Sequence, residues 1–252
     1  MYQYLLTPPK ELAQAGTYGL PLVHLAFQIG PDGRLRHPDL PPECRGGLML
    51  VGTDQAPQAG PAEQTAGAIL NICQRREFRG VVLDLEGEPT PFLSRLLPRL
   101  DRGLEQAGRG FFLPEIWASF SQRAFLYLSS ALSGGSLAKR LEEAARAYGP
   151  DRLVLALEPL SEEFPLPAPD GAGRPLDRTA LDNLLDRLRP TVHFSPDLCA
   201  HYFTYLDRKP RLILFDRADS FWKKRELGQA VGIQRFFLLY PQVKEFLDEE
   251  LT

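Results

Sequence analysis

The sequence predicts a single α/β domain built as a (β/α)₈ barrel, with a small inserted strand pair before the last strand. Three observations support this fold class. The chain has 252 residues, close to the usual length of such a barrel. Short apolar runs alternate with helical segments along most of the chain, as in repeated βα units. One apolar run ends in two carboxylates, Asp84 and Glu86, and barrel enzymes place their catalytic groups at that end of a strand.

The predicted strands are short apolar runs bounded by Gly, Pro or polar residues. They are Tyr2–Leu6, Leu22–Ile29, Leu48–Gly52, Val81–Glu86, Gly110–Leu113, Ala124–Leu128, Leu153–Leu157, Thr191–Phe194, Leu212–Phe215 and Arg235–Leu239. A barrel needs only eight of these. We therefore assign Thr191–Phe194 and Leu212–Phe215 to an insertion over residues 191–215, inside one domain that spans residues 1–252.

The predicted helices are amphipathic and end at recognisable stop signals. Ser136–Tyr148 begins with a Ser cap and ends at Gly149, and Pro91–Ala107 stops at Gly108. The other expected helices are Ala62–Arg76, Leu176–Leu188 and Phe221–Val231. Two irregular, Pro-rich and Gly-rich segments, residues 30–44 and 161–174, are expected to be loops, and such loops form the working face of a barrel.

The composition argues against several classes of partner. The net charge is −3 and the isoelectric point is about 5.9, which favours neither nucleic acid nor an anionic membrane. No apolar stretch approaches the roughly 20 residues that span a bilayer, and the first residues do not resemble a signal peptide. The three cysteines fit no metal motif. We therefore expect no metal and no cofactor, and a cytoplasmic location.

The two carboxylates are the strongest functional signal. Alternate residues of a strand point to one face, so Asp84 and Glu86 would lie side by side. Two adjacent carboxylates do not both ionise easily, so the pKa of one rises, which suits a general acid near neutral pH. Alternatively, the pair would only bind local backbone N–H groups or an Arg at the barrel rim. Arg79 would either pair with Asp84 or lie outside the barrel.

The strand that carries these carboxylates resembles the Asp-Gly-x-Asp-x-Asp-x-Glu motif of glycoside hydrolase family 18, the chitinase-like barrels. The aligned segment is Arg79-Gly80-Val81-Val82-Leu83-Asp84-Leu85-Glu86. Gly80, Asp84 and Glu86 match the motif. The first and second Asp of the motif are replaced by Arg79 and Val82.

Two further segments are similar to the sporulation-specific or spore-cortex glycosylase branch of that family. Tyr202-Phe203-Thr204-Tyr205 keeps the aromatics of an inserted hairpin, and Phe215–Ser220 keeps the segment that follows it. Tyr148–Leu155 resembles the junction between a helix and strand seven. The three motifs occur in the family's order, so the resemblance covers most of the chain.

The resemblance implies substrate-assisted hydrolysis of an N-acetylglucosamine polymer, either peptidoglycan or chitin. In this mechanism the acetamide oxygen of the sugar attacks its own anomeric carbon, so family 18 departs from the usual two-carboxylate scheme. Glu86 would protonate the leaving oxygen, and Asp84 would orient the acetamide. The spore branch favours peptidoglycan and an association with spores. The sequence makes no prediction of the oligomeric state.

Two departures from the family motifs support an alternative function. The family carries Met-x-Tyr-Asp on strand six, where this chain has Phe125–Ser130. Either Tyr127 stands in with the Asp lost, or Ser129 and Ser130 replace both residues. The family also places a Trp on the last strand, for which Tyr240 would be a displaced substitute. The alternative is a catalytically inactive barrel that binds sugar or has a structural role in spores.

Three more residues are candidates for binding substrate. Glu115 and Trp117 follow strand five and would line the cleft, or else pack within their loop. Glu158 ends strand seven and would face the centre, or else lie solvated at the rim. A further alternative is an unrelated barrel enzyme that uses Glu86 and Glu158 as a conventional pair, for which a carboxyl separation near about 5 Å would indicate a retaining enzyme.

Overall fold

Eight parallel strands close into a barrel in the computed structural model, which describes residues 1–53, 56–85, 87–168 and 173–250. The barrel strands are β1 (Tyr2–Thr7), β2 (Leu22–Ile29), β4 (Leu48–Thr53), β5 (Gly80–Leu85), β6 (Gly110–Pro114), β7 (Phe125–Ser129), β8 (Leu153–Leu157) and β14 (Arg235–Leu239). Their order around the ring is β1-β14-β8-β7-β6-β5-β4-β2, and β1 pairs with β2 to close it. The predicted (β/α)₈ barrel is confirmed. Outside the ring, the short β3 (Leu35–Arg36) pairs with β2.

The five predicted helices are present, with bounds that differ by only a few residues from the expected ones. The helices are α1 (Leu12–Gly16), α2 (Ala62–Arg75), α3 (Pro91–Gln106), α4 (Leu137–Tyr148), α5 (Arg178–Leu188), α6 (Ala218–Ala230) and α7 (Tyr240–Glu250). The first and last of these were not expected from the sequence. Among the described helices, none combines the length and apolar character that crossing a bilayer requires.

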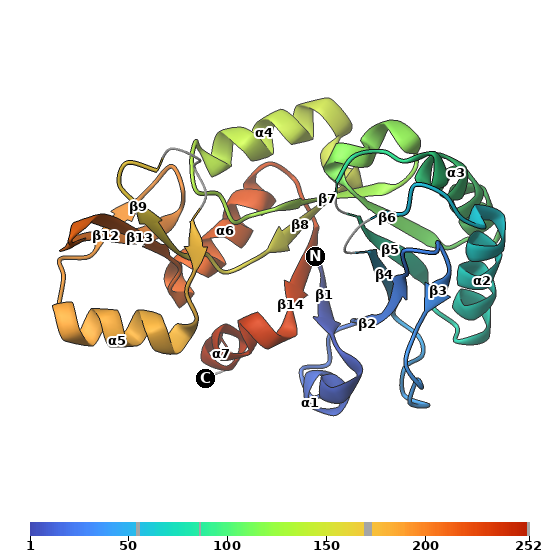
Figure 1. The fold of residues 1–252 in the computed structure, drawn as a ribbon, viewed down its shortest axis with the longest axis horizontal. Coiled ribbons are helices and arrows are strands. Elements are labelled where there is room, and N and C mark those ends of the chain that lie inside the picture. Colours follow the sequence, from blue (N-terminus) through green and yellow to red (C-terminus); the bar gives the residue numbers. More distant parts are fainter. Residues whose placement is uncertain (54–55, 86, 169–172, 251–252) are drawn as a thin grey trace. The chain divides into compact units, whose positions relative to one another are not determined.

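The chain divides into two compact units. The first comprises residues 1–128, 152–154 and 235–241, and the second comprises residues 129–151, 155–234 and 242–252. In the first unit, α2 and α3 lie side by side next to strands β4 to β6 (Figure 1). The side chain of Thr90 caps α3 by accepting a hydrogen bond of 3.2 Å from the backbone of Leu93, which satisfies a free N–H group of the first turn.

Strand β5 is buried on both of its faces, as a parallel barrel strand should be. Val82 pairs in register with Phe112 of β6, and the Phe112 ring contacts Tyr4 of β1 and Phe237 of β14. Since β1 and β14 lie several strands away around the ring, these contacts cross the barrel interior. Val82 therefore faces inward, and by alternation Asp84 faces inward two residues later, at the carboxyl end of the strand.

The second unit contains a five-stranded antiparallel sheet in the order β10-β9-β13-β12-β11. Its strands are β9 (Ser161–Pro165), β10 (Arg174–Pro175), β11 (His193–Ser195), β12 (Ala200–Asp207) and β13 (Lys209–Phe215). The strands expected between residues 191 and 215 are therefore present, but in a larger sheet. The expectation of a loop over residues 161–174 is wrong at both ends, which belong to β9 and β10 and pair with each other. β9 also pairs with β13, which is too distant in the sequence for a local pattern to reveal. The domain organisation expected from the sequence stays a prediction.

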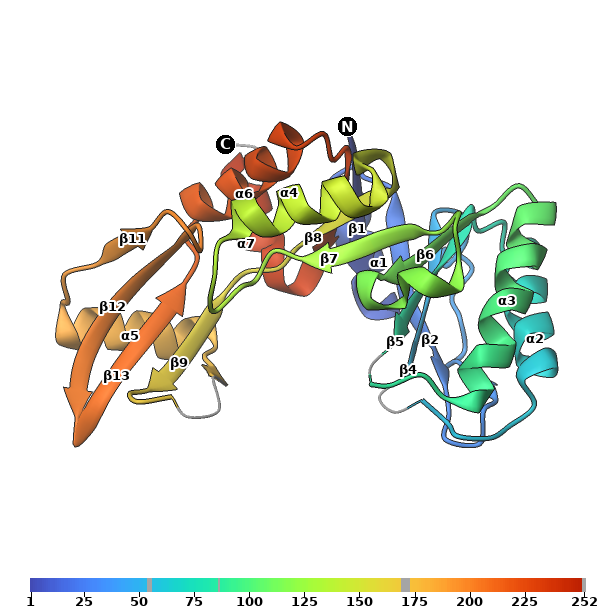
Figure 2. The same cartoon turned by 90° about the horizontal axis from the view of Figure 1, so that it is seen from above.

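Helix α5 covers one face of this sheet (Figure 2). Its Leu181 packs with Phe203, Ile213 and Phe215 of the sheet. The opposite face forms a second apolar cluster of Leu160, Phe164, Ala200 and Leu214. The odd-numbered and even-numbered residues of β12 and β13 thus face different sides, as the pleat of a strand requires.

A buried ion pair lies where the chain enters and leaves this sheet. Lys224 Nζ of α6 lies 2.6 Å from Asp216 Oδ2, and both side chains are fully buried. The same carboxylate accepts hydrogen bonds from the backbone of Leu160 (2.7 Å) and from the hydroxyl of Ser220 (2.8 Å). Every partner that a buried carboxylate needs is therefore supplied by nearby segments of the second unit.

Candidate functional site

Three residues lie level with one another on the inner face of the barrel mouth. The parallel register pairs Gln28 of β2 with Gly52 of β4, and Gly52 with Asp84 of β5. Gln28 and Asp84 are exposed to solvent, whereas the inward residues one level below, Leu50 and Val82, are buried. The polar layer therefore begins where the packed interior of the barrel ends, at the carboxyl ends of the strands.

A bulge in β2 brings Gln28 to this face. The register shifts between Leu25, which pairs with Leu50, and Phe27, which pairs with Val51. The extra residue, Ala26, reverses the alternation, so Phe27 points outward and packs against the Phe78 ring at a centroid distance of 6.0 Å. Bulges commonly re-aim a side chain beside a functional site.

A cavity of about 470 Å³ opens beside Asp84 at the ends of β2, β4 and β5. Gly52 leaves room there, because a Cβ atom added to it would meet only ordinary contacts, the nearest at 3.9 Å from the backbone oxygen of Asp84. His37 and Pro38 contribute the rim. Thr53 also lines the cavity, and its buried hydroxyl has no hydrogen-bond partner among the described residues. The volume lies in the range of small-ligand sites.

Tyr127 connects the two predicted site positions on β5 and β7. Its hydroxyl lies 3.1 Å from Asp84 Oδ1 and 3.0 Å from the carbonyl oxygen of Leu83. A phenol has one proton to donate, so the carboxylate and the carbonyl compete for it. Both alternatives considered for strand six stay predictions.

Arg79 lies far from Asp84, at the opposite end of β5. It lines a separate cavity of about 270 Å³ with Tyr2, Gly110 and Arg235, at the amino ends of the strands. Five residues of extended strand separate it from Asp84, or about 16 Å. A salt bridge between Arg79 and Asp84 is therefore impossible, and this replacement in the motif leaves the barrel mouth unaltered.

Four of the predicted site residues lie elsewhere or outside the described residues. Glu86, the predicted general acid, lies outside them. Trp117 is buried against the Phe120 ring at 5.4 Å, and Glu115 begins the same 3₁₀ helix, half-exposed. Tyr240 starts α7, is buried, and meets the Tyr18 ring edge-on at 5.8 Å. The structure does not bring these three residues to the cavity beside Asp84.

Glu158 follows β8 and is half-buried in the second unit. Its carboxylate accepts a short hydrogen bond from the hydroxyl of Ser129, and its backbone N–H donates to the Ser130 hydroxyl at 3.1 Å. The two serines that follow Tyr127 thus bind Glu158. Among the described residues, no three His, Cys, Asp or Glu side chains gather as a metal site would require.

Sequence reasoning missed Gln28, Gly52 and Thr53. Gly52 carried a usable signal, because a glycine at the end of an apolar strand often marks a site where a ligand approaches closely. Thr53 follows it directly. Gln28 carried no such signal, because its inward position depends on the bulge at Ala26.

No protein-family model matches this sequence, and a search of curated proteins finds no significant match. Solved structures do match. The spore cortex-lytic enzyme SleL of Bacillus megaterium QM B1551 is 13% identical, with a TM-score of 0.70 over 98% of this chain and 73% of that one. A chitinase from Chromobacterium violaceum ATCC 12472 is 13% identical, with a TM-score of 0.67 over 97% and 98%.

A GH18 chitinase from Cycas revoluta, solved in complex with (GlcNAc)₃, is 14% identical, with a TM-score of 0.64 over 99% of this chain and 98% of that one. At these identities the likeness concerns the fold. The chain therefore has a family 18-like barrel, and the resemblance found in its motifs is confirmed at the level of the fold.

Proposed function

We propose that this chain is a glycoside hydrolase that cleaves N-acetylglucosamine-containing polymers, peptidoglycan or chitin. One observation carries the proposal: Asp84 lies on the inner face at the carboxyl end of β5, bonded to Tyr127, beside an open cavity. Two structural neighbours support the proposal: one is a chitinase solved with (GlcNAc)₃ bound, and the other is a spore cortex-lytic enzyme. The latter likeness favours peptidoglycan and an association with spores.

The proposed mechanism is substrate-assisted retaining hydrolysis. The acetamide oxygen attacks the anomeric carbon while Glu86 donates a proton to the departing glycosidic oxygen, so the C–O bond breaks as an oxazolinium ring forms. Asp84 accepts a hydrogen bond from the acetamide N–H and stabilises the positive charge of the ring. Water then adds to the anomeric carbon with Glu86 as the base, which restores the acetamide and the acid.

Tyr127 has a positioning role in this mechanism. Because its proton is shared between Asp84 and the Leu83 carbonyl, it holds the carboxylate in place. When a substrate acetamide binds, the phenol is also a suitable donor to the acetamide oxygen. Tyr127→Phe should therefore lower kcat more than it raises KM.

A second candidate function is sugar binding without hydrolysis. The observation that favours it is Val82, which faces inward directly below Asp84 and is buried. The family 18 motif has a carboxylate at this position, which Val82 cannot supply. A barrel of this kind would keep the sugar site and lose the chemistry.

The two candidates are separated by hydrolysis of a chromogenic di-N-acetylchitobioside and of purified peptidoglycan. Wild type is compared with Glu86→Gln and Asp84→Asn, and with Glu115→Gln as a control. We expect Glu86→Gln to lower kcat by about 10²–10⁴-fold, the usual contribution of a general acid, and the control to keep its rate. No turnover by folded wild type on either substrate would overturn the enzyme proposal and leave the binding function.

A further inference from the structure

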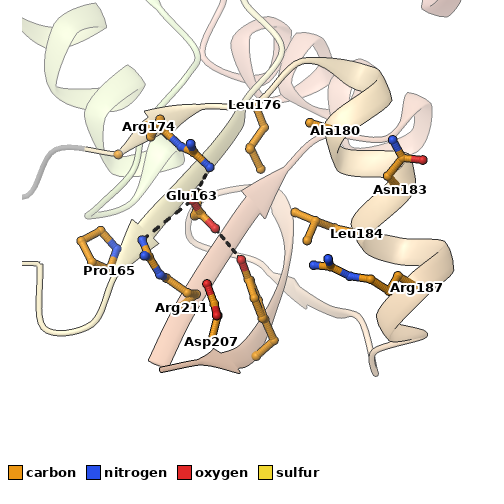
Figure 3. A pocket seen from close by; sticks show the side chains of 12 residues that line it. Glu163, Pro165, Arg174, Leu176, Ala180, Asn183, Leu184, Arg187, Asp207 and Arg211 are labelled. Atoms are coloured by element: carbon orange, nitrogen blue, oxygen red, sulfur yellow. Dashed lines mark hydrogen bonds and ion pairs between the residues drawn. The ribbon is translucent and has the colours of Figure 1, made fainter. Parts of the chain in front are cut away.

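A second cavity, of about 940 Å³, lies between α5 and the inserted sheet, wholly within the second unit (Figure 3). Its volume is in the range of small-molecule sites. One wall is apolar, with Pro165, Leu176, Ala180 and Leu184. The other is charged, with Glu163, Arg174, Arg187, Asp207 and Arg211. The cavity therefore combines an apolar wall with a wall that carries three arginines and two carboxylates.

The strand register explains why the charges gather on one face. Glu163 of β9 pairs with Ile213 of β13, and Arg211 of β13 pairs with Tyr205 of β12. By alternation, these residues share the face that α5 covers. The helix packs against the apolar part of this face, around Ile213 and Phe203, and the charged part is left to line the cavity.

Glu163 is the structural centre of the charged wall and is only 5% exposed. It accepts a hydrogen bond of 2.5 Å from the Tyr205 hydroxyl and one of 2.7 Å from Arg174, and Arg211 lies 3.9 Å away. Burial by itself would raise the pKa of Glu163, but the hydrogen bond from Tyr205 and the charges of Arg174 and Arg211 hold the pKa below its ordinary value. Glu163 is therefore ionised, and it fixes two guanidinium groups.

The guanidinium groups keep donors to spare. Each has five N–H groups, and Glu163 uses few of them. The buried Nε of Arg211 has no acceptor among the described residues. Arg187 of α5 lines the cavity and forms no ion pair with any described residue. A buried donor without an acceptor costs free energy, and an anionic ligand that accepts from Arg211 Nε would remove that cost. Arg187 is exposed and would add its charge.

We propose that this cavity binds a carboxylate-bearing sugar. A guanidinium group matches a planar carboxylate through two parallel hydrogen bonds, which Arg187 and Arg211 would supply, while the apolar wall packs against the ring and its methyl groups. The choice of a sugar rests on the proposed function; the choice of a carboxylate rests on the cavity. Asp207 lies at the same wall and weakens the attraction for an anion.

The proposal is tested with two sugars that differ in one group. N-acetylmuramic acid is N-acetylglucosamine with a lactyl ether, which adds a carboxylate and a methyl group. Each is titrated into the full chain, and backbone amide signals are followed by NMR. The signals of Asn183, Leu184 and Tyr205 report this cavity, and those of Gly52 report the barrel mouth. We expect N-acetylmuramic acid to saturate the first set and to bind there at least about tenfold more tightly than N-acetylglucosamine.

Substitutions in the charged wall are expected to change the affinity for N-acetylmuramic acid in opposite directions. Arg187→Gln and Arg211→Gln should each weaken binding of N-acetylmuramic acid about tenfold or more, because each removes charged hydrogen bonds. Asp207→Asn should strengthen it several-fold, because a like charge is removed. Arg178→Gln is the matched control: Arg178 is on the same helix and carries the same charge, but it pairs with Asp182 and Glu245, so its loss should change nothing.

Three results would overturn the proposal: no saturation of these signals, equal affinity for the two sugars, or equal affinity in Arg187→Gln and Arg178→Gln. None of them depends on turnover. A chain that hydrolyses the chitobioside but fails this titration would keep its proposed function and lose only the second site. A chain that binds N-acetylmuramic acid here without hydrolysing any substrate would keep the second site and lose the proposed enzyme function.

Discussion

Asp84 and Glu163 are both carboxylates beside a cavity, and their surroundings are opposite. Asp84 is exposed at the barrel mouth, and the described donor that it meets is the Tyr127 hydroxyl. Glu163 is buried in the inserted sheet, where Tyr205 and two arginines surround it. Asp84 is thus available to a ligand, whereas Glu163 is already engaged by hydrogen bonds and ion pairs within the protein.

This difference separates a group that can do chemistry from a group that builds a surface. A carboxylate must keep accessible lone pairs to stabilise a substrate charge. A carboxylate whose lone pairs are filled, like Glu163 or the buried Asp216, instead fixes the position of its partners. Substitutions at these two kinds of carboxylate test this division.

The largest effect is expected where a buried charge loses the counter-ion that the described residues supply. Lys224→Ala leaves Asp216 charged and fully buried, and breaking such a pair costs about 3–5 kcal/mol of the free energy of unfolding. The measurement is urea unfolding followed by circular dichroism. Lys223→Ala, at the exposed neighbouring position, should cost under about 1 kcal/mol. Equal losses in the two variants would contradict a structural role for Asp216.

A smaller loss is expected for Glu163→Gln, about 1.5–3 kcal/mol at pH 7, from its hydrogen bonds to charged groups. Because the pKa of Glu163 is lowered in the folded state, its contribution is present above the unfolded pKa of about 4.5 and is lost as pH falls through the folded pKa. Wild type and the variant should therefore converge in acid. Urea unfolding at several pH values measures this gap. Glu162→Gln is the control, and a gap that persists unchanged in acid would show that charge is not the cause.

The smallest effect is expected at the barrel mouth. Gly52→Leu places a side chain in the cavity beside Asp84, where its Cβ atom would meet only ordinary contacts. We therefore expect kcat/KM to fall by at least about tenfold and the free energy of unfolding to change by less than about 1 kcal/mol. Steady-state hydrolysis of the chitobioside and urea unfolding measure the two quantities. Gly67→Ala, at a helical position with open space around it, should leave kcat/KM unchanged. A variant that keeps full activity would remove the cavity from the substrate site.

The barrel could be predicted from sequence because its strands are local apolar runs. The bounds of β2, β8 and β14 match the expected ones, and those of the other barrel strands differ by a residue or two. The inserted sheet was less predictable. Strand β9 contains Glu163, a buried charged residue, so its sequence does not show the pattern of an apolar strand. Arg211, one of the arginines that offset this charge, lies on β13, far along the sequence.

The candidate site was predictable where one strand defines it. Asp84 follows from its position at the end of β5, and Tyr127 follows from the resemblance on strand six. Gln28 and Gly52 require the register between strands, which no local pattern reports. Trp117 was a candidate because it follows strand five, and Tyr240 as a displaced substitute for the Trp that the family places on the last strand. Both rings instead pack against other aromatic rings.

The hydrogen bonds between Leu160 and Asp216 have a consequence for the history of this fold. The backbone N–H of each residue donates to an oxygen of the other at 2.7 Å, although 56 residues separate them in the chain. The segment between them is thus a closed loop with joined ends. Closing a loop twice as long costs only about 0.6 kcal/mol more. Changes in the length of this segment should therefore cost little free energy, and the pairing of Leu160 with Asp216 can be kept when the segment is lengthened or shortened.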